Sequence, residues 1–201
     1  MLRKDLAKTA TKTAPDRRTA IADAAIEVLA SGGSRGLTHR AVDRQLGIAE
    51  GSTSTYHRTR EQLVQAAAER ISELDLAAVV AALTPQPATL HDAAHQLGEM
   101  IAEAVRVENR ARQRARYALI VESASNPKLR ATFLKVTGPV LDVTTPLFRE
   151  LGAKDPELGA SALAVYINGL ILTMVTRPDD EPELISPDQL EDLMERFIQD
   201  F

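Results

Sequence analysis

The first pattern that could do chemistry is a Gly-x-Ser-x-Gly motif, formed by Gly32, Ser34 and Gly36. In a hydrolase this motif holds a nucleophilic serine on a turn between a strand and a helix. Here the residues before it have helical periodicity and no strand is found, so we interpret the motif as a helix end followed by a turn. No nucleophile elsewhere has a base at credible spacing. The sequence therefore predicts a protein that is not an enzyme and uses no cofactor.

A second pattern places His91, His95 and Glu99 four residues apart, on one face of a helix. Zinc sites use such spacing, but a tetrahedral site needs more ligands than these residues supply. The sequence contains no cysteine, and no fourth ligand can be placed. We expect no metal site, and the absence of cysteine favours a cytoplasmic location.

A third pattern, between Leu37 and His57, combines the spacing of two short helices with many hydroxyl groups. Thr38 has the side chain of a helix N-cap, and Gly47 supplies a turn where φ can be positive. The second helix, from about Glu50 to Tyr56, has small and hydroxyl side chains. It can lie in a DNA major groove, with its N-terminal residues at base edges and its hydroxyls at phosphates. A buried helical hairpin in an ordinary α-domain is the alternative interpretation.

This interpretation selects candidate DNA contacts. We assign Thr38 and His39 to phosphates, and Arg40 to a guanine edge because arginine to guanine is the commonest specific contact. The second helix contributes Ser52, Thr53, Ser54, Thr55 and Tyr56.

Residues 17–63 resemble the N-terminal domain of the TetR family of transcriptional regulators. The resemblance is collinear and without gaps, and the matching segments are Arg17-Arg18, 21–25, 36–38, 42–51, Tyr56, 58–61 and Leu63. It implies a homodimer that binds double-stranded DNA at a near-palindromic operator. It also places Arg60, on the following helix, beside a phosphate.

Five positions depart from the family's usual residues: Asp43, Ala49, Glu50, Ser54 and His57. We expect Asp43 and His57 to loosen the packing under the recognition helix, and Ser54 to remove a frequent phosphate contact. Glu50 is expected to repel phosphate, although it suits a helix N-terminus and could accept a hydrogen bond from a cytosine amino group.

The fold class predicted from helical periodicity is all-α. We expect a disordered basic arm over 1–15, a three-helix helix-turn-helix DNA-binding domain over 16–62, and a helical ligand-binding and dimerisation domain over 63–201. Residues 1–60 hold eleven Lys or Arg against six Asp or Glu, whereas residues 61–201 hold thirteen against twenty-two. A basic head on an acidic body favours phosphate contact confined to the head.

Within the body, expected helices cover about 59–83, 89–107, 127–151 with a kink at Gly138-Pro139, 158–176, and 187 to the end. The arginines between Glu108 and Arg116 are spaced by two, which spreads them around a helix, so we interpret them as a solvated surface.

The segment Leu158–Thr176 contains no charged residue. A membrane span is a rival interpretation, but polar residues interrupt the segment and acidic residues flank it. We instead expect no membrane partner and a helix buried on nearly all sides, against its own domain and a second subunit. With the amphipathic last helix it would form a four-helix bundle between two chains.

The resulting hypothesis is a ligand-responsive homodimeric regulator, most simply a repressor. An unknown small-molecule effector would bind among polar or adaptable residues on otherwise apolar helices: Met100, Tyr117, Tyr166, Asn168 and Met174. Two rival classes are an α-helical enzyme and a helical protein-interaction module with weakened DNA binding.

Overall fold

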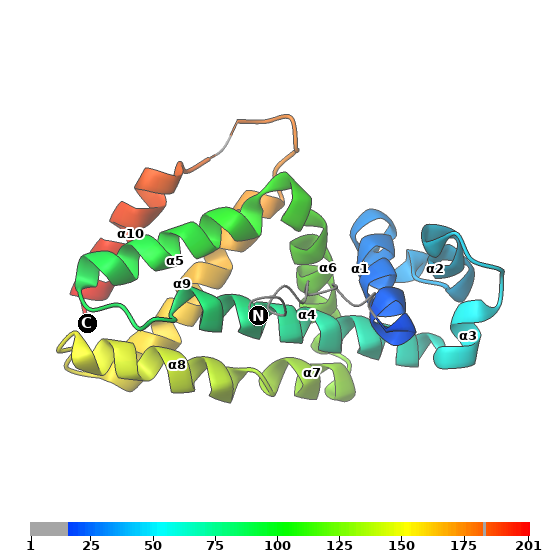
Figure 1. Ribbon diagram of the computed structural model, residues 1–201, viewed down its shortest axis with the longest axis horizontal. Helices are drawn as coiled ribbons and strands as arrows, with labels where there is room; N and C mark the ends of the chain where they lie inside the picture. Colours follow the sequence, from blue (N-terminus) through cyan, green and yellow to red (C-terminus); the bar gives the residue numbers. More distant parts are fainter. Residues whose placement is uncertain (1–15, 183) are drawn as a thin grey trace, which may run out of the picture.

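A computed structural model describes residues 16–182 and 184–201, so the predicted arm over 1–15 lies outside the described residues. The described residues form ten α-helices and no strand, which confirms the all-α prediction (Figure 1). The helices are α1 (Arg17–Gly36), α2 (His39–Leu46), α3 (Ser52–Tyr56), α4 (Arg60–Ala82), α5 (Leu90–Val105), α6 (Val107–Ser123), α7 (Pro127–Leu134), α8 (Thr137–Glu150), α9 (Pro156–Val175) and α10 (Pro187–Gln199).

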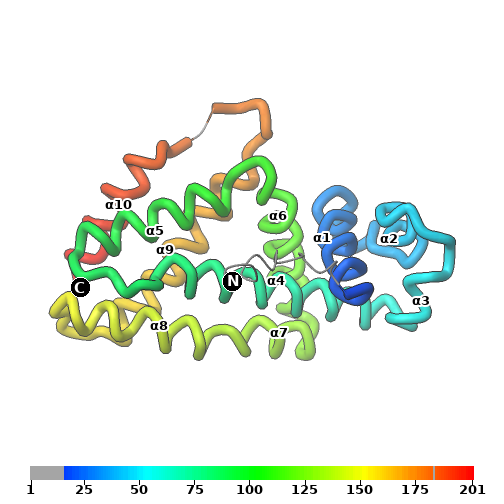
Figure 2. The backbone as a smooth tube through the Cα atoms, viewed as in Figure 1, coloured from blue at the N-terminus to red at the C-terminus, as the bar shows by residue number. Residues whose placement is uncertain are grey.

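Two regions are visible along the long axis of the molecule. Helices α1, α2 and α3 form a head at one end, and α4 runs from this head into the body made by α5 to α10 (Figure 2). The apolar core of the head contains Ile21, Leu37 and Leu63, and it continues into the body through Leu119 of α6 and Leu129 of α7. Packing therefore crosses the predicted domain boundary at 62–63.

Most helices begin at a residue whose side chain caps the first turn. Side chains of these residues accept hydrogen bonds from backbone amides in the first turn, as N-caps do. The caps are Thr38, Thr59, Thr89, Asn126, Asp155 and Ser186. The cap at Thr38 confirms the prediction made for that residue. At Thr59 the side chain of Gln62 completes a capping box.

Two helix ends differ from expectation. Gly33 interrupts α1 with a φ of 62°, but the chain then continues in a short helical turn to Gly36. The predicted kink at Gly138-Pro139 is instead a break between Leu134 and Thr137. Pro139 is accommodated in the first turn of α8. Backbone N–H groups there have no hydrogen-bond partner within the helix, so the N–H that proline lacks removes no hydrogen bond.

The last helix packs within its own chain. The buried stripe of α10, formed by Leu190, Met194 and Ile198, lies on α5. The two helices approach closely at Gly98, where an added Cβ would stand 3.1 Å from the backbone nitrogen of Glu191. These three side chains are therefore buried within the chain, and the predicted four-helix bundle between two chains stays a prediction.

Helix α9 is long and apolar enough to cross a membrane by length and composition alone, yet it packs on α8, α6 and α5. Only 33% of its most apolar window is buried within the chain. Leu158 is 56% exposed, Val165 74% and Leu172 41%. The expected burial on nearly all sides is thus incomplete within one chain.

Candidate nucleic-acid interface

Helix α3, the predicted recognition helix, is held by a carboxylate that reaches it from α2. Asp43 is fully buried, and its two oxygens accept hydrogen bonds from the amides of Gly51 (2.7 Å) and Thr53 (2.9 Å). These amides belong to the N-terminus of α3, which otherwise has no side-chain cap. Asp43 therefore caps α3 from another helix, and the expectation that it loosens the packing is wrong.

The electrostatics of Asp43 agree with this role. Burial raises the pKa of Asp43, but hydrogen bonds from Thr53 and from the amide of Gly51 outweigh that effect, so the pKa lies below its ordinary value. A carboxylate that accepts backbone N–H bonds favours its charged form. Asp43 is thus an anion at neutral pH and complements the positive end of the short helix.

The side chains of α3 divide into an inward and an outward set. Thr53 is fully buried, so the prediction that its side chain contacts DNA is wrong. Ser54, Thr55 and Tyr56 are exposed, and Ser52 is half-buried. The hydroxyls of Ser52 and Ser54 donate to the carbonyl oxygens of Ala49 and Gly51 at 2.6 Å each, which leaves their lone pairs free.

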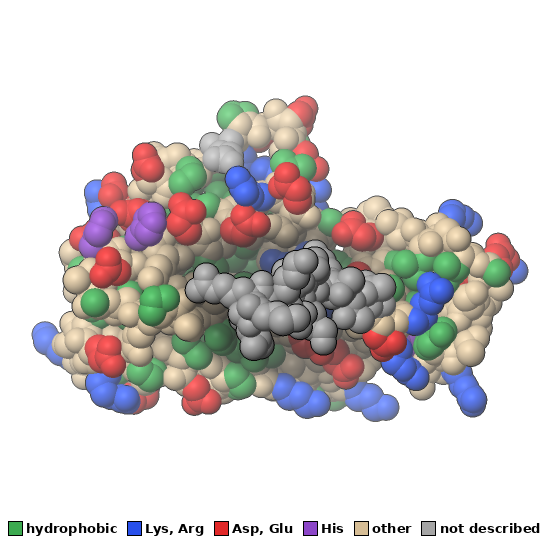
Figure 3. All heavy atoms as spheres, viewed as in Figure 1, with side chains coloured by type: hydrophobic (Ala, Val, Ile, Leu, Met, Phe, Trp, Pro, Cys, Tyr) green, Lys and Arg blue, Asp and Glu red, His purple; other side chains and the backbone are tan. Residues whose placement is uncertain are grey.

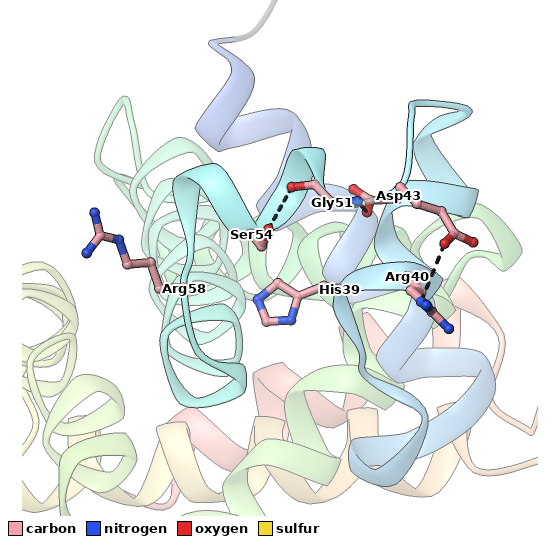
Figure 4. A pocket seen from close by; sticks show the side chains of 7 residues that line it. His39, Arg40, Asp43, Gly51, Ser54 and Arg58 are labelled. Carbon is pink, nitrogen blue, oxygen red and sulfur yellow. Dashed lines mark hydrogen bonds and ion pairs between the residues drawn. The ribbon is translucent and has the colours of Figure 1, made fainter.

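Of the outward residues, Ser54 lines a surface concavity together with residues at the start of α2. It measures about 390 Å³ and is lined by His39, Arg40, Asp43, Glu50, Gly51, Ser54 and Arg58 (Figure 4). Arg40 Nε lies 3.4 Å from Glu50 Oε2, and the two side chains are 78% and 69% exposed. Thr38 is also exposed, and its oxygen accepts from the amide of Ala41.

Two contacts fix the far end of α3. His39 Nε2 donates to the carbonyl oxygen of His57 at 2.6 Å, and Arg18 donates to the carbonyl oxygen of Tyr56 at 3.3 Å. Burial, and then the positive charges of Arg18 and His39, lower the pKa of His57, so its ring is neutral at pH 7. His39 thus binds α2 to the residue after α3, a role that sequence reasoning did not find.

Arg60 is placed at the junction of head and body. Its guanidinium donates to the carbonyl oxygen of Ser34 (2.5 Å) and to the hydroxyl oxygen of Ser34 (2.6 Å). The Ser34 hydroxyl in turn donates to Glu122 on α6. The Arg60 guanidinium is thus already bound to Ser34 within the chain. Its predicted contact with a phosphate stays a prediction.

The predicted effector residues all lie in the body, and a hydrogen bond joins two of them. Tyr117 on α6 donates from its hydroxyl to the carbonyl oxygen of Asn168 on α9, at 2.8 Å. Tyr166 stacks on Phe197 with ring centroids 4.6 Å apart. Met174 is buried in the body core, and Met100 packs against its edge.

The arginines between Glu108 and Arg116 do not form the solvated surface that their spacing suggested. Arg110 is 9% exposed and, with Arg114, donates to Asp179 in the loop after α9. Arg116 pairs with Asp75 of α4 at 2.6 Å. Burial raises the pKa of Asp75, and the charges of Arg116 and Arg112 oppose this shift. These side chains point inward because α6 packs against its neighbours. The periodicity of the sequence does not reveal that packing.

The histidines that suggested a metal site instead pair with carboxylates of α10. His95 Nδ1 lies 2.7 Å from Glu191 Oε2, and His91 Nδ1 lies 3.4 Å from Glu191 Oε1. In the space-filling view the histidines stand beside acidic side chains on the surface of the body (Figure 3). Among the described residues, no group of three potential ligands is arranged to hold a metal ion.

Comparisons with known proteins agree with this architecture. A family model described as the tetracyclin repressor-like C-terminal domain matches residues 88–200. A comparison with curated proteins gives no match.

Three solved structures illustrate the likeness. A TetR-family member from Streptomyces coelicolor A3 is 27% identical, with a TM-score of 0.68, covering 91% of this chain and 98% of that one. The multidrug binding protein EbrR, complexed with ethidium, is 26% identical, with a TM-score of 0.66 and the same coverage of 91% and 98%. A transcriptional regulator from Rhodococcus sp. Rha1 is 18% identical, with a TM-score of 0.74, covering 92% and 95%, and supports the fold alone.

Proposed function

The chain belongs to the TetR family of transcriptional regulators, and we propose that it is a cytoplasmic, homodimeric, ligand-responsive repressor. In this proposal the dimer binds a near-palindromic operator, and a small-molecule effector releases it. The observation that carries the proposal is the recognition helix α3: its N-terminus is capped by the buried Asp43, and Ser54, Thr55 and Tyr56 face outward.

At the operator, α3 would enter the major groove while α2 approaches the backbone. Arg40 and Ser54 line the concavity in front of α3 and are proposed to meet base edges there. Thr38, with its hydroxyl proton available, and His39 are proposed at phosphates. Basic side chains are spread over the head (Figure 3), which supplies the sequence-independent attraction to DNA.

The proposed dimer uses the outer face of α9. Leu158, Val165 and Leu172 leave an apolar face uncovered along this helix. Beside it, a surface groove between α8 and α9 is lined by residues that include Leu141, Thr145 and Ser161. Covering this face with the same face of a second copy gives a self-complementary interface with two-fold symmetry. That symmetry would set two heads at a fixed spacing, as a palindromic operator requires.

The effector is proposed to act between α6 and α9. EbrR, a relative, is a multidrug binding protein whose structure contains ethidium. In this chain Tyr117 of α6 holds the carbonyl oxygen of Asn168 on α9, and a ligand that displaces this hydrogen bond would favour another arrangement of the two helices. Ligand binding shifts an equilibrium by its differential affinity for the two states.

A route from the body to the head runs through Ser34. A displacement of α6 would move Glu122, which accepts from the Ser34 hydroxyl, and Ser34 is also bound by Arg60 at the start of α4. Since Arg60 directly follows the cap of α4 and lies close to α3 in the chain, the same displacement would reorient the recognition helix.

The test is a binding measurement on DNA upstream of the protein's own gene and its neighbours, at two salt concentrations. The proposal predicts a footprint at a near-palindromic sequence and an affinity that falls steeply with salt. An absence of sequence preference, with a shallow salt dependence, would instead support a helical protein-interaction module. Sedimentation of the free protein tests the dimer separately.

A further inference from the structure

The acidic residue in front of the recognition helix requires an explanation. Glu50 directly precedes Gly51, the residue before α3, and its side chain is 69% exposed in the concavity that faces outward. DNA phosphates repel a carboxylate at this place. Its only ion-pair partner among the described residues is Arg40, at 3.4 Å.

Stability does not explain this pair. Ion pairs between exposed side chains contribute about 0–1 kcal/mol because water screens them, and Arg40 is 78% exposed. Neither side chain supports the core, and Asp43 already caps α3. The Arg40 guanidinium, which donates hydrogen bonds, and the Glu50 carboxylate, which accepts them, lie side by side on the surface that would meet DNA. The dashed line at Arg40 in Figure 4 marks this pair.

The arrangement matches the edge of one kind of base pair. In the major groove guanine offers two acceptors, N7 and O6, and its partner cytosine offers one donor, the N4 amino group. An arginine donates to the two guanine acceptors, and a carboxylate accepts from the cytosine amino group. An A·T pair places acceptors on both sides of its single amino group, so it does not match the same order of donors and acceptor.

We propose that Arg40 and Glu50 together read one G·C base pair in each half of the operator, with Arg40 on guanine and Glu50 on cytosine. This inference rests on the proposed DNA-binding function. Glu50 would act in two ways: its carboxylate accepts a hydrogen bond from the cytosine amino group at the correct site, and its negative charge repels DNA wherever no such hydrogen bond offsets the repulsion. Glu50 therefore weakens binding to unrelated DNA and raises the preference for G·C at this base pair, as a repulsive element in a specific interface does.

The test is a selection from a pool of randomised DNA duplexes, carried out with the full chain and with Glu50→Ala and Glu50→Gln. Glu61→Gln is the matched control, because Glu61 is an exposed acid in the first turn of α4, next to the head, that does not line the concavity. Binding of each variant to an unrelated duplex is measured in parallel, and circular dichroism verifies that the variants fold.

The wild type should select a near-palindrome with G·C at one position of each half. Both Glu50 variants should lose that preference by about tenfold, within the range of roughly 5- to 150-fold that one good base contact supplies, and should bind the unrelated duplex more tightly. Glu61→Gln should keep the wild-type preference. Unchanged selectivity in Glu50→Ala, or an equal loss for all sequences, would overturn the inference. A wild type that selects no sequence would overturn the proposed function itself.

Discussion

The cap that Asp43 provides to α3 can be tested by removing it. Asp43→Ala deletes both hydrogen bonds, to Gly51 at 2.7 Å and to Thr53 at 2.9 Å. Hydrogen bonds to charged groups contribute about 1.5–3 kcal/mol each. Gly51 is exposed, so water can replace the lost partner of its amide, whereas Thr53 is buried and its amide stays unpaired. We expect α3 to lose about 3 kcal/mol of local stability, most of it at Thr53.

Hydrogen exchange measures this loss directly. A change of about 3 kcal/mol corresponds to roughly a hundredfold lower protection of the Thr53 amide, since each 1.4 kcal/mol is tenfold. Operator affinity should fall with it, because α3 must be ordered to bind. Asp43→Asn keeps one acceptor oxygen without the charge and should lie between the wild type and Asp43→Ala. Gln45→Ala, at an exposed position of the same helix, is the control.

The same cap predicts a pH dependence with a definite sign. Because the pKa of Asp43 is lower in the folded protein than its ordinary value of 3.8, its stabilisation is complete above that value. It is lost as the pH falls through the lower, folded-state pKa. Protection of Thr53 should thus persist at neutral pH and fall only in acid, and Asp43→Asn should lack this acid transition. Equal protection at Thr53 in Asp43→Ala and the wild type would refute the reasoning.

Three further predictions concern the body and its junction with the head. Val165→Glu places a charge in the proposed dimer face, and sedimentation should show a monomer with a normal helical spectrum; a persistent dimer would place the interface elsewhere. Gly159→Ala brings a Cβ to 2.5 Å from the ring of Phe148, so thermal unfolding should show a loss of about 1–3 kcal/mol, whereas Gly169→Ala, with no neighbour there, should show none. Ser34→Ala removes the hydroxyl shared by Arg60 and Glu122; operator release by an effector should weaken while effector binding is retained, and an unchanged release would exclude this route.

Local signals made the helix starts predictable from the sequence. A cap such as Thr38 depends on a backbone amide only three positions away, and the structure forms it as expected. Arg40 and Ser54 are exposed, as their predicted contacts with DNA require, and the contacts themselves stay predictions. The inward position of Thr53 was not found, since a five-residue helix is too short for its periodicity to identify a buried face.

The remaining errors concern side chains whose partners are distant in the chain. The sequence does not reveal the role of Asp43, because its partners are two backbone amides that no residue type identifies. It predicts solvated side chains for Arg110 and Arg116, because Asp179 and Asp75, which bind them, lie on other elements. The role of such a charged residue is apparent only in the folded structure, where the groups that bind it are known.

The shared core between head and body determines how a signal can travel. Ala115 and Leu119 of α6 are buried together with Ile21 and Leu29 of α1, in the same core as Leu63 of α4. A head attached by a flexible linker could swing freely while the body changed, and effector binding would then carry no information to DNA. Here α1 cannot keep its packing if α6 shifts, because well-packed interfaces repack rather than deform continuously. We therefore propose that the buried contact of α6 with α1, more than any single hydrogen bond, would couple the recognition helix to the proposed effector site.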